Sequence, residues 1–219
     1  FREGMYIQCR VHRPIRVGTD CSGIEVPILA LTRLGLNFDH IFSSESNRKV
    51  RNFIRSEFNP CLLYSHVEGR VPLEVPSVDL YISGFPCQPF SVAGKQRGFE
   101  DCKARGTIFF SIAEYIYMKR PKCFLLENVK GLTTIKGGKY RKAVMSVLRS
   151  IGRKDGLPPY ELHEFVLNTC QHGIPHCRAR WYCAGIRSDI VPTGGSGFEV
   201  PQALIGCPSI DCFLDASYG

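Results

Sequence analysis

Short runs of apolar and β-branched residues alternate along the chain with longer stretches in which apolar residues recur at helical spacing. The short runs predict strands, since polar, Gly or Pro residues bound them within a few positions. The longer stretches predict amphipathic helices, because residues three and four apart fall on one face of a helix. The predicted strands are residues 15–20, 40–44, 78–82, 123–126, 161–167 and 181–186, and the predicted helices are residues 27–34, 48–58, 108–118 and 140–151.

This alternation of strand and helix predicts a doubly wound α/β fold with a mostly parallel sheet and helices on both faces. Ligands of such sheets bind in the crevice beyond the carboxyl ends of the strands. Polar residues from four distant segments are expected there, namely residues 21–23, Glu45, residues 86–88 and residues 127–128. The sequence therefore predicts one site gathered along that edge.

At 219 residues, with 44% hydrophobic and 22% charged residues, the chain has the composition of a folded globular domain. No apolar run approaches the length of a membrane span, and the first residues lack the pattern of a secretory signal. We therefore expect an intracellular protein with no membrane partner. The net charge of +8 fits a polyanionic partner, and it fits simple solubility equally well.

The composition changes after residue 187, where Gly and Pro accumulate, as in residues 192–197. No helix or long strand is predicted there. We expect an N-terminal extension over residues 1–14, the folded domain over residues 15–187, and a linker or tail over residues 188–219. Because the chain begins at Phe1 rather than at Met, a fragment or a processed product is expected.

The chain contains 11 cysteines, but their spacing predicts neither a disulfide framework nor a metal site. The cysteines at 170, 177, 183, 207 and 212 form no paired Cys-x-x-Cys units, which structural zinc sites require. Most of these thiols are expected to be small buried hydrophobic groups.

Cys87 has a different setting from the other cysteines. It follows a predicted buried strand and lies between Pro86 and Pro89, which restrict the backbone on either side. A thiol held on a rigid turn at the edge of the crevice is suited to act as a nucleophile. The alternative is an inert cysteine buried in a proline-rich turn.

Residues 84–91, Gly-Phe-Pro-Cys-Gln-Pro-Phe-Ser, resemble the nucleophile block of the cytosine C5 methyltransferases. Further blocks of that family follow in the same order, and the resemblance as a whole runs over residues 16–187. Residues 94–101 and 105–110 resemble the mobile active-site loop and the helix after it, residues 127–129 resemble the Glu-Asn-Val block, and residues 172–175 with 178–180 resemble the paired-arginine block. The resemblance implies a Rossmann-like methyltransferase fold for the predicted domain.

The resemblance implies that Cys87 adds to C6 of cytosine while Glu127 donates a proton or hydrogen bond to N3. Arg180, together with Arg178, would contact the base carbonyl or order the site. Taken alone, Glu127 would be a surface carboxylate and the arginine pair a solvated face. Because the reacting base must leave a duplex, the expected partner is double-stranded DNA with a flipped base. The residues implied to contact this substrate are Ser91, Lys95, Gln96, Arg97 and Asn128.

The implied cofactor is S-adenosylmethionine, bound by a tight turn after the first strand. Glu45 would hold its ribose hydroxyls. Two positions depart from the family pattern: Glu25 replaces a glycine, and His66 replaces an acidic residue. The residues expected to bind the cofactor are Cys21, Ser22, Gly23, Ile24, Glu45, Ser46, His66, Val67, Pro86 and Ile108.

No block corresponding to the family's target-recognition region follows the paired arginines. We expect that region on another segment or on a second chain. Two alternatives to a DNA methyltransferase stay open, an RNA cytosine C5 methyltransferase and an inactive regulatory or structural subunit. The expected location is the nucleus in a eukaryote or the cytoplasm in a bacterium.

Overall fold

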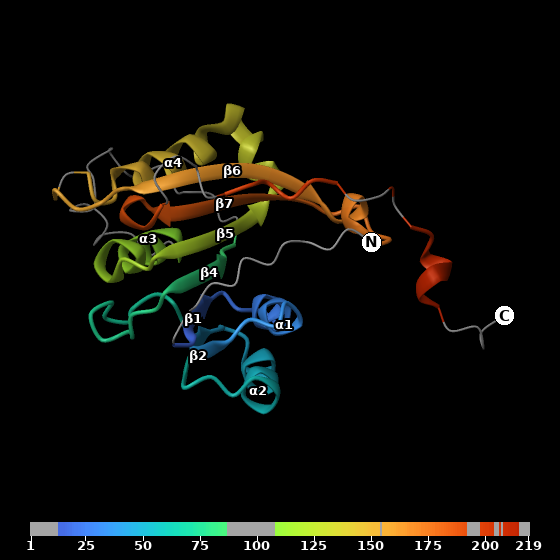
Figure 1. Ribbon diagram of the computed structural model, residues 1–219, viewed down its shortest axis with the longest axis horizontal. Helices are drawn as coiled ribbons and strands as arrows, with labels where there is room; N and C mark the ends of the chain where they lie inside the picture. The colour runs from blue at the N-terminus through green and yellow to red at the C-terminus, as the bar shows by residue number, and fades with distance from the viewer. Residues whose placement is uncertain are drawn as a thin grey trace.

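The computed structural model describes residues 13–86, 108–153, 155–191, 198–203, 206 and 208–214. Its strands form one seven-stranded sheet in the order β3-β2-β1-β4-β5-β7-β6 (Figure 1). The strands are β1 (Ile15–Asp20), β2 (Phe38–Ser44), β3 (Leu62–Tyr64), β4 (Leu80–Gly84), β5 (Cys123–Val129), β6 (Tyr160–Asn168) and β7 (Ala179–Arg187), and the α-helices are α1 (Val26–Arg33), α2 (Arg48–Glu57), α3 (Ile108–Lys119) and α4 (Lys139–Ser150).

The sheet is mostly parallel, as predicted. Strands β1 to β5 pair in parallel, whereas β7 runs antiparallel to both β5 and β6. The reversal arises because β6 and β7 are joined by residues 169–178 alone, which contain a short 3₁₀ helix, Thr169–His172, and no α-helix. A parallel pairing needs a longer crossover, so these two strands pair directly as neighbours.

The helices cover both faces of the sheet. From β1 the chain steps through α1 to β2 on one side, and from β4 through α3 to β5 on the other side. Since both crossovers are right-handed by rule, the two steps place their helices on opposite faces. The main hydrophobic core includes Phe42, Tyr81 and Phe124 with buried residues of α3 and α4, which lie together on one face (Figure 1).

Two strand glycines make room for aromatic rings of this core. A Cβ atom on Gly18 would lie 2.3 Å from the Phe42 ring, and one on Gly185 would lie 2.2 Å from the Phe124 ring. Glycine weakens a strand, but here it lets a large ring cross the neighbouring backbone. Both rings are almost completely buried as a result.

Every predicted strand and helix is present, with ends that differ by a few residues. The sequence pattern missed β3, whose three residues are too few to show an alternation. It also ended β5 too early. This strand continues to Val129, because its last residues pair with β7, so Glu127 and Asn128 lie within the strand rather than beyond it.

The expectation that most of the later cysteines are buried was wrong. Cys183 is buried, but Cys177 and Cys212 are exposed and Cys170 is half-buried. The reason is their position, since Cys183 lies on the core face of β7 whereas the others lie in connections outside the sheet.

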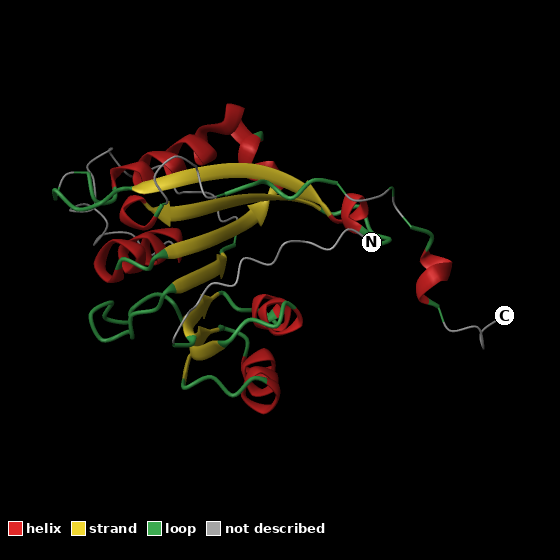
Figure 2. Ribbon diagram, viewed as in Figure 1, coloured by secondary structure: helices red, strands yellow, loops and turns green. Residues whose placement is uncertain are grey.

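No helix in the described ranges is long and apolar enough to cross a membrane. Past β7, the described segments contain two short 3₁₀ helices, Ser188–Ile190 and Ile210–Phe213, and the second lies apart from the sheet (Figure 2). The ring of Phe198 stacks on His163 and Phe165 of β6, with centroids 4.8 and 5.4 Å away. The predicted division at residues 14 and 187 stays a prediction.

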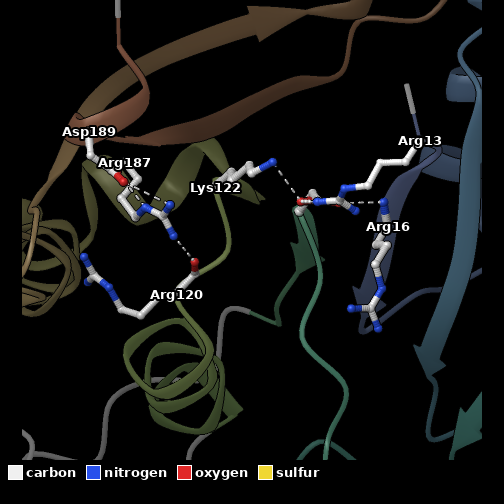
Figure 3. Close-up of polar contacts among 7 residues, drawn as sticks. Arg13, Arg16, Arg120, Lys122, Arg187 and Asp189 are labelled. Atoms are coloured by element: carbon white, nitrogen blue, oxygen red, sulfur yellow. Dashed lines mark hydrogen bonds and ion pairs between the residues drawn. The ribbon is translucent and has the colours of Figure 1, made fainter. Parts of the chain in front are cut away.

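Charged side chains pair with one another at the amino edge of the sheet, where the parallel strands begin (Figure 3). Asp79, just before β4, accepts hydrogen bonds from both terminal nitrogens of Arg13 at 2.8 and 2.9 Å and forms an ion pair with Lys122 at 3.2 Å. Arg187, at the end of β7, binds Asp189 at 2.6 Å. These contacts connect residues that precede or end four different strands.

Candidate active site

The residues predicted to form the site lie along the carboxyl edge of the sheet, where the parallel strands end. Following the strand order, this edge carries His66 after β3, Glu45 after β2, the turn over residues 21–24 after β1, Pro86 after β4 and Glu127 in β5. The amino end of antiparallel β7 completes the row with Arg178 and Arg180. The strand order reverses between β1 and β4, which is where sheets of this kind bind ligands.

Glu127 and the two arginines form an ionic cluster. The Glu127 Oε1 atom lies 3.1 Å from Arg180 Nε and 3.7 Å from Arg178 Nη1. The β5–β7 register places Arg180 opposite Val129, two residues along the strand from Glu127, so the two side chains are diagonal neighbours on the ladder. The Glu127 and Arg180 side chains are 27% and 22% exposed, so solvent or a ligand can reach them.

The chain leading to Cys87 leaves the sheet beside Glu127. Gly84 is the residue paired with Glu127, and a Cβ atom on Gly84 would lie 3.3 Å from Glu127 Oε2. The Asn128 Nδ2 atom donates a hydrogen bond to the Phe85 carbonyl at 2.8 Å, and Asn128 is buried. This bond fixes the backbone just before Pro86, next to the carboxylate.

Asn128 uses its side chain for structure. Besides the bond to Phe85, its Oδ1 atom accepts a hydrogen bond from the Val129 amide at 2.8 Å. Both polar groups of the amide are thus engaged within the chain. The predicted substrate contact by Asn128 is not tested by these contacts and stays a prediction.

The turn after β1 is attached to Glu45. The Gly23 amide donates to Glu45 Oε2 at 3.0 Å, and the Asn47 amide donates to Oε1 at 2.8 Å. Gly23 has a φ of 54°, which favours glycine, and nothing lies within 4 Å of the position its Cβ would take. The turn thus presents exposed Gly23 and Ile24 beside the half-buried Glu45 carboxylate.

Three of the residues predicted to bind the cofactor direct their side chains inward. The Ser22 hydroxyl is buried and accepts a hydrogen bond from the Ser44 amide at 3.2 Å. Val67 is part of the hydrophobic core, and Cys21 packs against it. Burial raises the pKa of the Cys21 thiol to about 12. Any contact that these residues make with a ligand therefore involves mainly their backbone.

The other residues predicted to bind the cofactor lie at the carboxyl edge. Ile24, Ser46, His66 and Pro86 are exposed, and Ile108 is half-buried at the start of α3. The Ser46 hydroxyl lies 3.5 Å from Glu45 Oε1. Their roles stay predictions, as does the role of Glu45.

Cys87 itself, with Ser91, Lys95, Gln96 and Arg97, lies outside the described residues. What the structure places is the end of the strand before this segment and the start of the helix after it. The roles assigned to these five residues stay predictions.

Sequence reasoning did not identify a buried ion pair beneath the turn. Asp20 Oδ2 contacts Arg70 and accepts a hydrogen bond from the Tyr81 hydroxyl at 2.5 Å. Arg70 also donates to the Ser44 hydroxyl at 2.7 Å, and its guanidinium lies over the Tyr64 ring. The pair connects the loop that carries His66 to the ends of β1 and β2. The one signal in the sequence was Asp20, a charged residue that follows the uncharged residues 17–19 at the end of β1.

Known proteins resemble this chain in both sequence and structure. A model of the family C-5 cytosine-specific DNA methylase matches residues 20–205. The type II methyltransferase M.NgoBI of Neisseria gonorrhoeae is 42% identical over 153 residues, which are 70% of this chain and 45% of that protein. M.HaeII of Haemophilus aegyptius is 38% identical over 165 residues, 75% of this chain and 47% of that protein. The chain thus spans less than half the length of either relative.

Among solved structures, a DNMT2 mutant of Spodoptera frugiperda superposes with a TM-score of 0.69 at 20% identity, covering 92% of this chain and 60% of the other. Dnmt2 of S. pombe gives a TM-score of 0.64 at 19% identity, covering 92% and 59%. At this identity the structural likeness establishes the fold. The family model covers most of the chain, and the chain therefore belongs to the C-5 cytosine-specific DNA methylase family.

Proposed function

We propose that this chain supplies the catalytic part of an enzyme that transfers a methyl group from S-adenosylmethionine to C5 of cytosine in double-stranded DNA. The observation that carries the proposal is the position of Glu127. Its Oε1 atom pairs with Arg180, and its Oε2 atom faces Gly84, three residues before Cys87. A carboxyl group, a guanidinium and the approach to a thiol thus meet at one point of the carboxyl edge.

The chemistry of cytosine explains the need for this arrangement. C5 of cytosine is a poor nucleophile, so the Cys87 thiolate first adds to C6 and forms a carbon–sulfur bond. Electron density moves into the ring, and the Glu127 carboxyl group relieves it by donating a proton or hydrogen bond to N3. Arg180 donates to the base carbonyl oxygen and holds Glu127 in place. After C5 gains the methyl group, a base removes the C5 proton and the thiolate leaves.

S-adenosylmethionine, when bound, supplies the electrophilic methyl group. The turn over residues 21–24 would hold its amino-acid part through backbone groups, and Glu45 would accept hydrogen bonds from its ribose hydroxyls. The Glu45 oxygens already accept bonds from the Gly23 and Asn47 amides, which fixes the carboxylate orientation. Carboxylate oxygens can accept further bonds, so this role is compatible with those contacts.

The cytosine has to be flipped out of the duplex, since a stacked base does not present C6 to a thiol at a protein edge. Ser91, Lys95, Gln96 and Arg97 would close over the DNA backbone, with Gly94 and Gly98 as hinges. Recognition of the DNA sequence would come from a segment or a second chain beyond these residues. An intracellular location follows from a DNA substrate.

Covalent trapping tests nucleophile and substrate together. The full-length protein is incubated with S-adenosylmethionine and a duplex in which the target cytosine carries fluorine at C5. Fluorine replaces the C5 proton that a base would remove and cannot itself leave as a cation, so the thiolate is not released. A protein–DNA adduct that survives denaturation is expected. Cys87→Ser should abolish the adduct, whereas Cys61→Ser, which removes an exposed thiol just before β3, should keep it.

The same experiment separates the alternatives. An adduct with a matched RNA and none with DNA would identify an RNA methyltransferase instead. A folded wild-type protein that forms no adduct with either substrate and binds no S-adenosylmethionine by calorimetry would contradict the proposal in favour of a regulatory or structural subunit. An adduct that persists in Cys87→Ser would contradict the assigned nucleophile.

A further inference from the structure

Glu25 is a completely buried acid directly after the cofactor turn. It precedes α1, and its φ and ψ of 58° and 40° lie in the left-handed region that favours glycine. The sequence places Glu25 where the family usually has a glycine. A buried carboxyl group on a left-handed backbone is costly twice over, and such a residue persists only when its side chain makes compensating contacts.

Those contacts join the ends of two strands. Glu25 Oε1 accepts a hydrogen bond from the Thr19 hydroxyl of β1 at 2.7 Å and from the Ser43 hydroxyl of β2 at 2.5 Å. Thr19 lies two residues before Cys21, where the turn begins, and Ser43 lies two residues before Glu45. One carboxyl group therefore connects the two strand ends that carry the predicted contacts to the cofactor.

The network continues into the turn itself. The Thr19 hydroxyl lies 2.8 Å from the Ser22 hydroxyl, which in turn accepts the Ser44 amide at 3.2 Å. On the exposed side, the Gly23 amide binds Glu45 at 3.0 Å. The turn is thus held to β2 from both sides, by Glu45 outside and through Glu25 inside.

The surroundings of Glu25 favour hydrogen bonding over ion pairing. Burial raises the pKa of Glu25, although hydrogen bonds from Ser43 and Thr19 oppose the rise. Burial also lowers the pKa of His40, whose Nε2 atom is 3.7 Å from Glu25, to about 4. A neutral His40 leaves the two hydroxyl donors as the principal partners of Glu25 Oε1.

We propose that Glu25 is a positioning residue for S-adenosylmethionine, which fixes the spacing between the turn over residues 21–24 and Glu45 by bonding Thr19 and Ser43 together. This inference rests on the proposed function, because it assumes that the turn and Glu45 hold that cofactor. Glu25 does not touch the cofactor itself, since its side chain is buried beneath the turn.

The test compares Glu25→Gly with Glu25→Gln in the full-length protein. Glycine accepts the left-handed backbone but has no side chain to join the strands, whereas the amide oxygen of glutamine still accepts from Thr19 and Ser43. Since two buried hydrogen bonds are lost, Glu25→Gly should weaken S-adenosylmethionine binding in calorimetry about tenfold or more. Glu25→Gln should stay within about threefold of wild type, a difference of well under 1.4 kcal/mol.

A matched control is Asn59→Gly, because Asn59 also has a positive φ, 41°, and lies away from the turn at the end of α2. This variant should bind the cofactor as wild type does. Kinetics add a second measurement: KM for S-adenosylmethionine should rise in Glu25→Gly, with kcat at saturating cofactor nearly unchanged.

Wild-type affinity in Glu25→Gly, with a lowered unfolding temperature, would overturn the inference and leave a purely structural role. An equal loss of affinity for S-adenosylmethionine in Glu25→Gln and Glu25→Gly would also overturn the inference. Should Glu25→Gly fail to fold, Ser43→Ala removes one of the two donors to Glu25. For the inference to hold, the loss in free energy of cofactor binding in this variant has to exceed its loss in free energy of unfolding. A folded wild-type protein that binds no S-adenosylmethionine would instead contradict the proposed function.

Discussion

The two edges of the sheet use charged side chains in opposite ways. At the amino edge, Asp79 takes two bonds from Arg13 and a third contact from Lys122, so cations from two other segments satisfy one anion (Figure 3). At the carboxyl edge, Glu127 is held by Arg180 on one oxygen while the other faces Gly84.

This difference separates charges that stabilise the fold from charges available for chemistry. Groups that mainly pair with one another, each held between strand ends, contribute to stability and have little capacity left for a ligand. Glu127, whose contacts with Arg178 and Arg180 both involve Oε1, keeps Oε2 available to bind or donate. Substitutions at the two edges should therefore affect different properties, stability at the amino edge and activity at the carboxyl edge.

Glu127→Gln should give the largest effect. The amide keeps the shape of the side chain and can still donate a hydrogen bond, but it cannot transfer an acidic proton to N3, so we expect methyl transfer to fall about 10²–10⁴-fold. The unfolding temperature should stay close to wild type. Incorporation of labelled methyl groups into DNA, with thermal unfolding in parallel, measures both, and near-normal activity would remove Glu127 from the mechanism.

Arg180→Ala should have the next largest effect on methyl transfer. Without the guanidinium at 3.1 Å, Glu127 loses the partner that orients it, and misplacement of a catalytic group can cost about a hundredfold in rate. Arg178→Ala serves as the comparison, because Arg178 lies farther from the carboxylate, at 3.7 Å, and is more exposed. The comparison fails if Arg178→Ala is the more damaging change in single-turnover kinetics.

Asp79→Asn should change stability and leave cofactor affinity unaltered. The loss of charge weakens the contacts with Arg13 and Lys122, and we expect the free energy of unfolding to fall by about 1–2 kcal/mol. Urea unfolding measures this loss. A marked fall in S-adenosylmethionine binding would show that the two edges are not independent.

The contribution of Asp79 should also depend on pH. Burial opposes ionisation, but hydrogen bonds from Arg13, the Arg16 amide and Lys122 lower the pKa of Asp79 to about 2. Since an unfolded aspartate has a pKa of about 3.9, the folded state gains stability above that pH and loses it as the pH falls toward 2. The difference in unfolding free energy between wild type and Asp79→Asn should shrink over this window and stay constant between pH 5 and 7.

Asp189→Asn should have the smallest effect. Its partner Arg187 also donates to the Arg120 carbonyl at 2.8 Å, so Arg187 keeps a second contact when the ion pair is lost. We expect a smaller change in unfolding temperature than for Asp79→Asn and normal methyl transfer. A larger change than that of Asp79→Asn would reverse the order proposed for the amino edge.

Much of the fold followed from the sequence because strands and helices each have their own spacing of apolar residues. The strand over residues 15–20 was predicted at its observed bounds, since its end is marked by the polar turn after Asp20. The short strand β3 was not predicted, and neither was the antiparallel direction of β7. Strand direction depends on which partner the chain meets, which no local pattern reports.

The sequence predicted which residues lie at the site but not the contacts that their side chains make. The carboxyl-edge positions of Glu45 and Glu127 follow from the strand order, but the pairing of Glu127 with Arg180 requires the β5–β7 register. The inward contacts of Ser22, Asp20 and Glu25 were not foreseen, because burying a polar group depends on partners far away in sequence. Polar residues beside a turn look alike in sequence whether they face a ligand or the interior.

The antiparallel ladder between β5 and β7 has a consequence for protein engineering. Because Glu127 and Arg180 lie two rungs apart on the ladder, their alignment is set by backbone pairing before the chain leaves the sheet at Arg187. Grafting a different downstream module after that point should leave the acid and the guanidinium aligned. An odd-numbered insertion within either strand would instead swing one of them to the opposite side of the sheet.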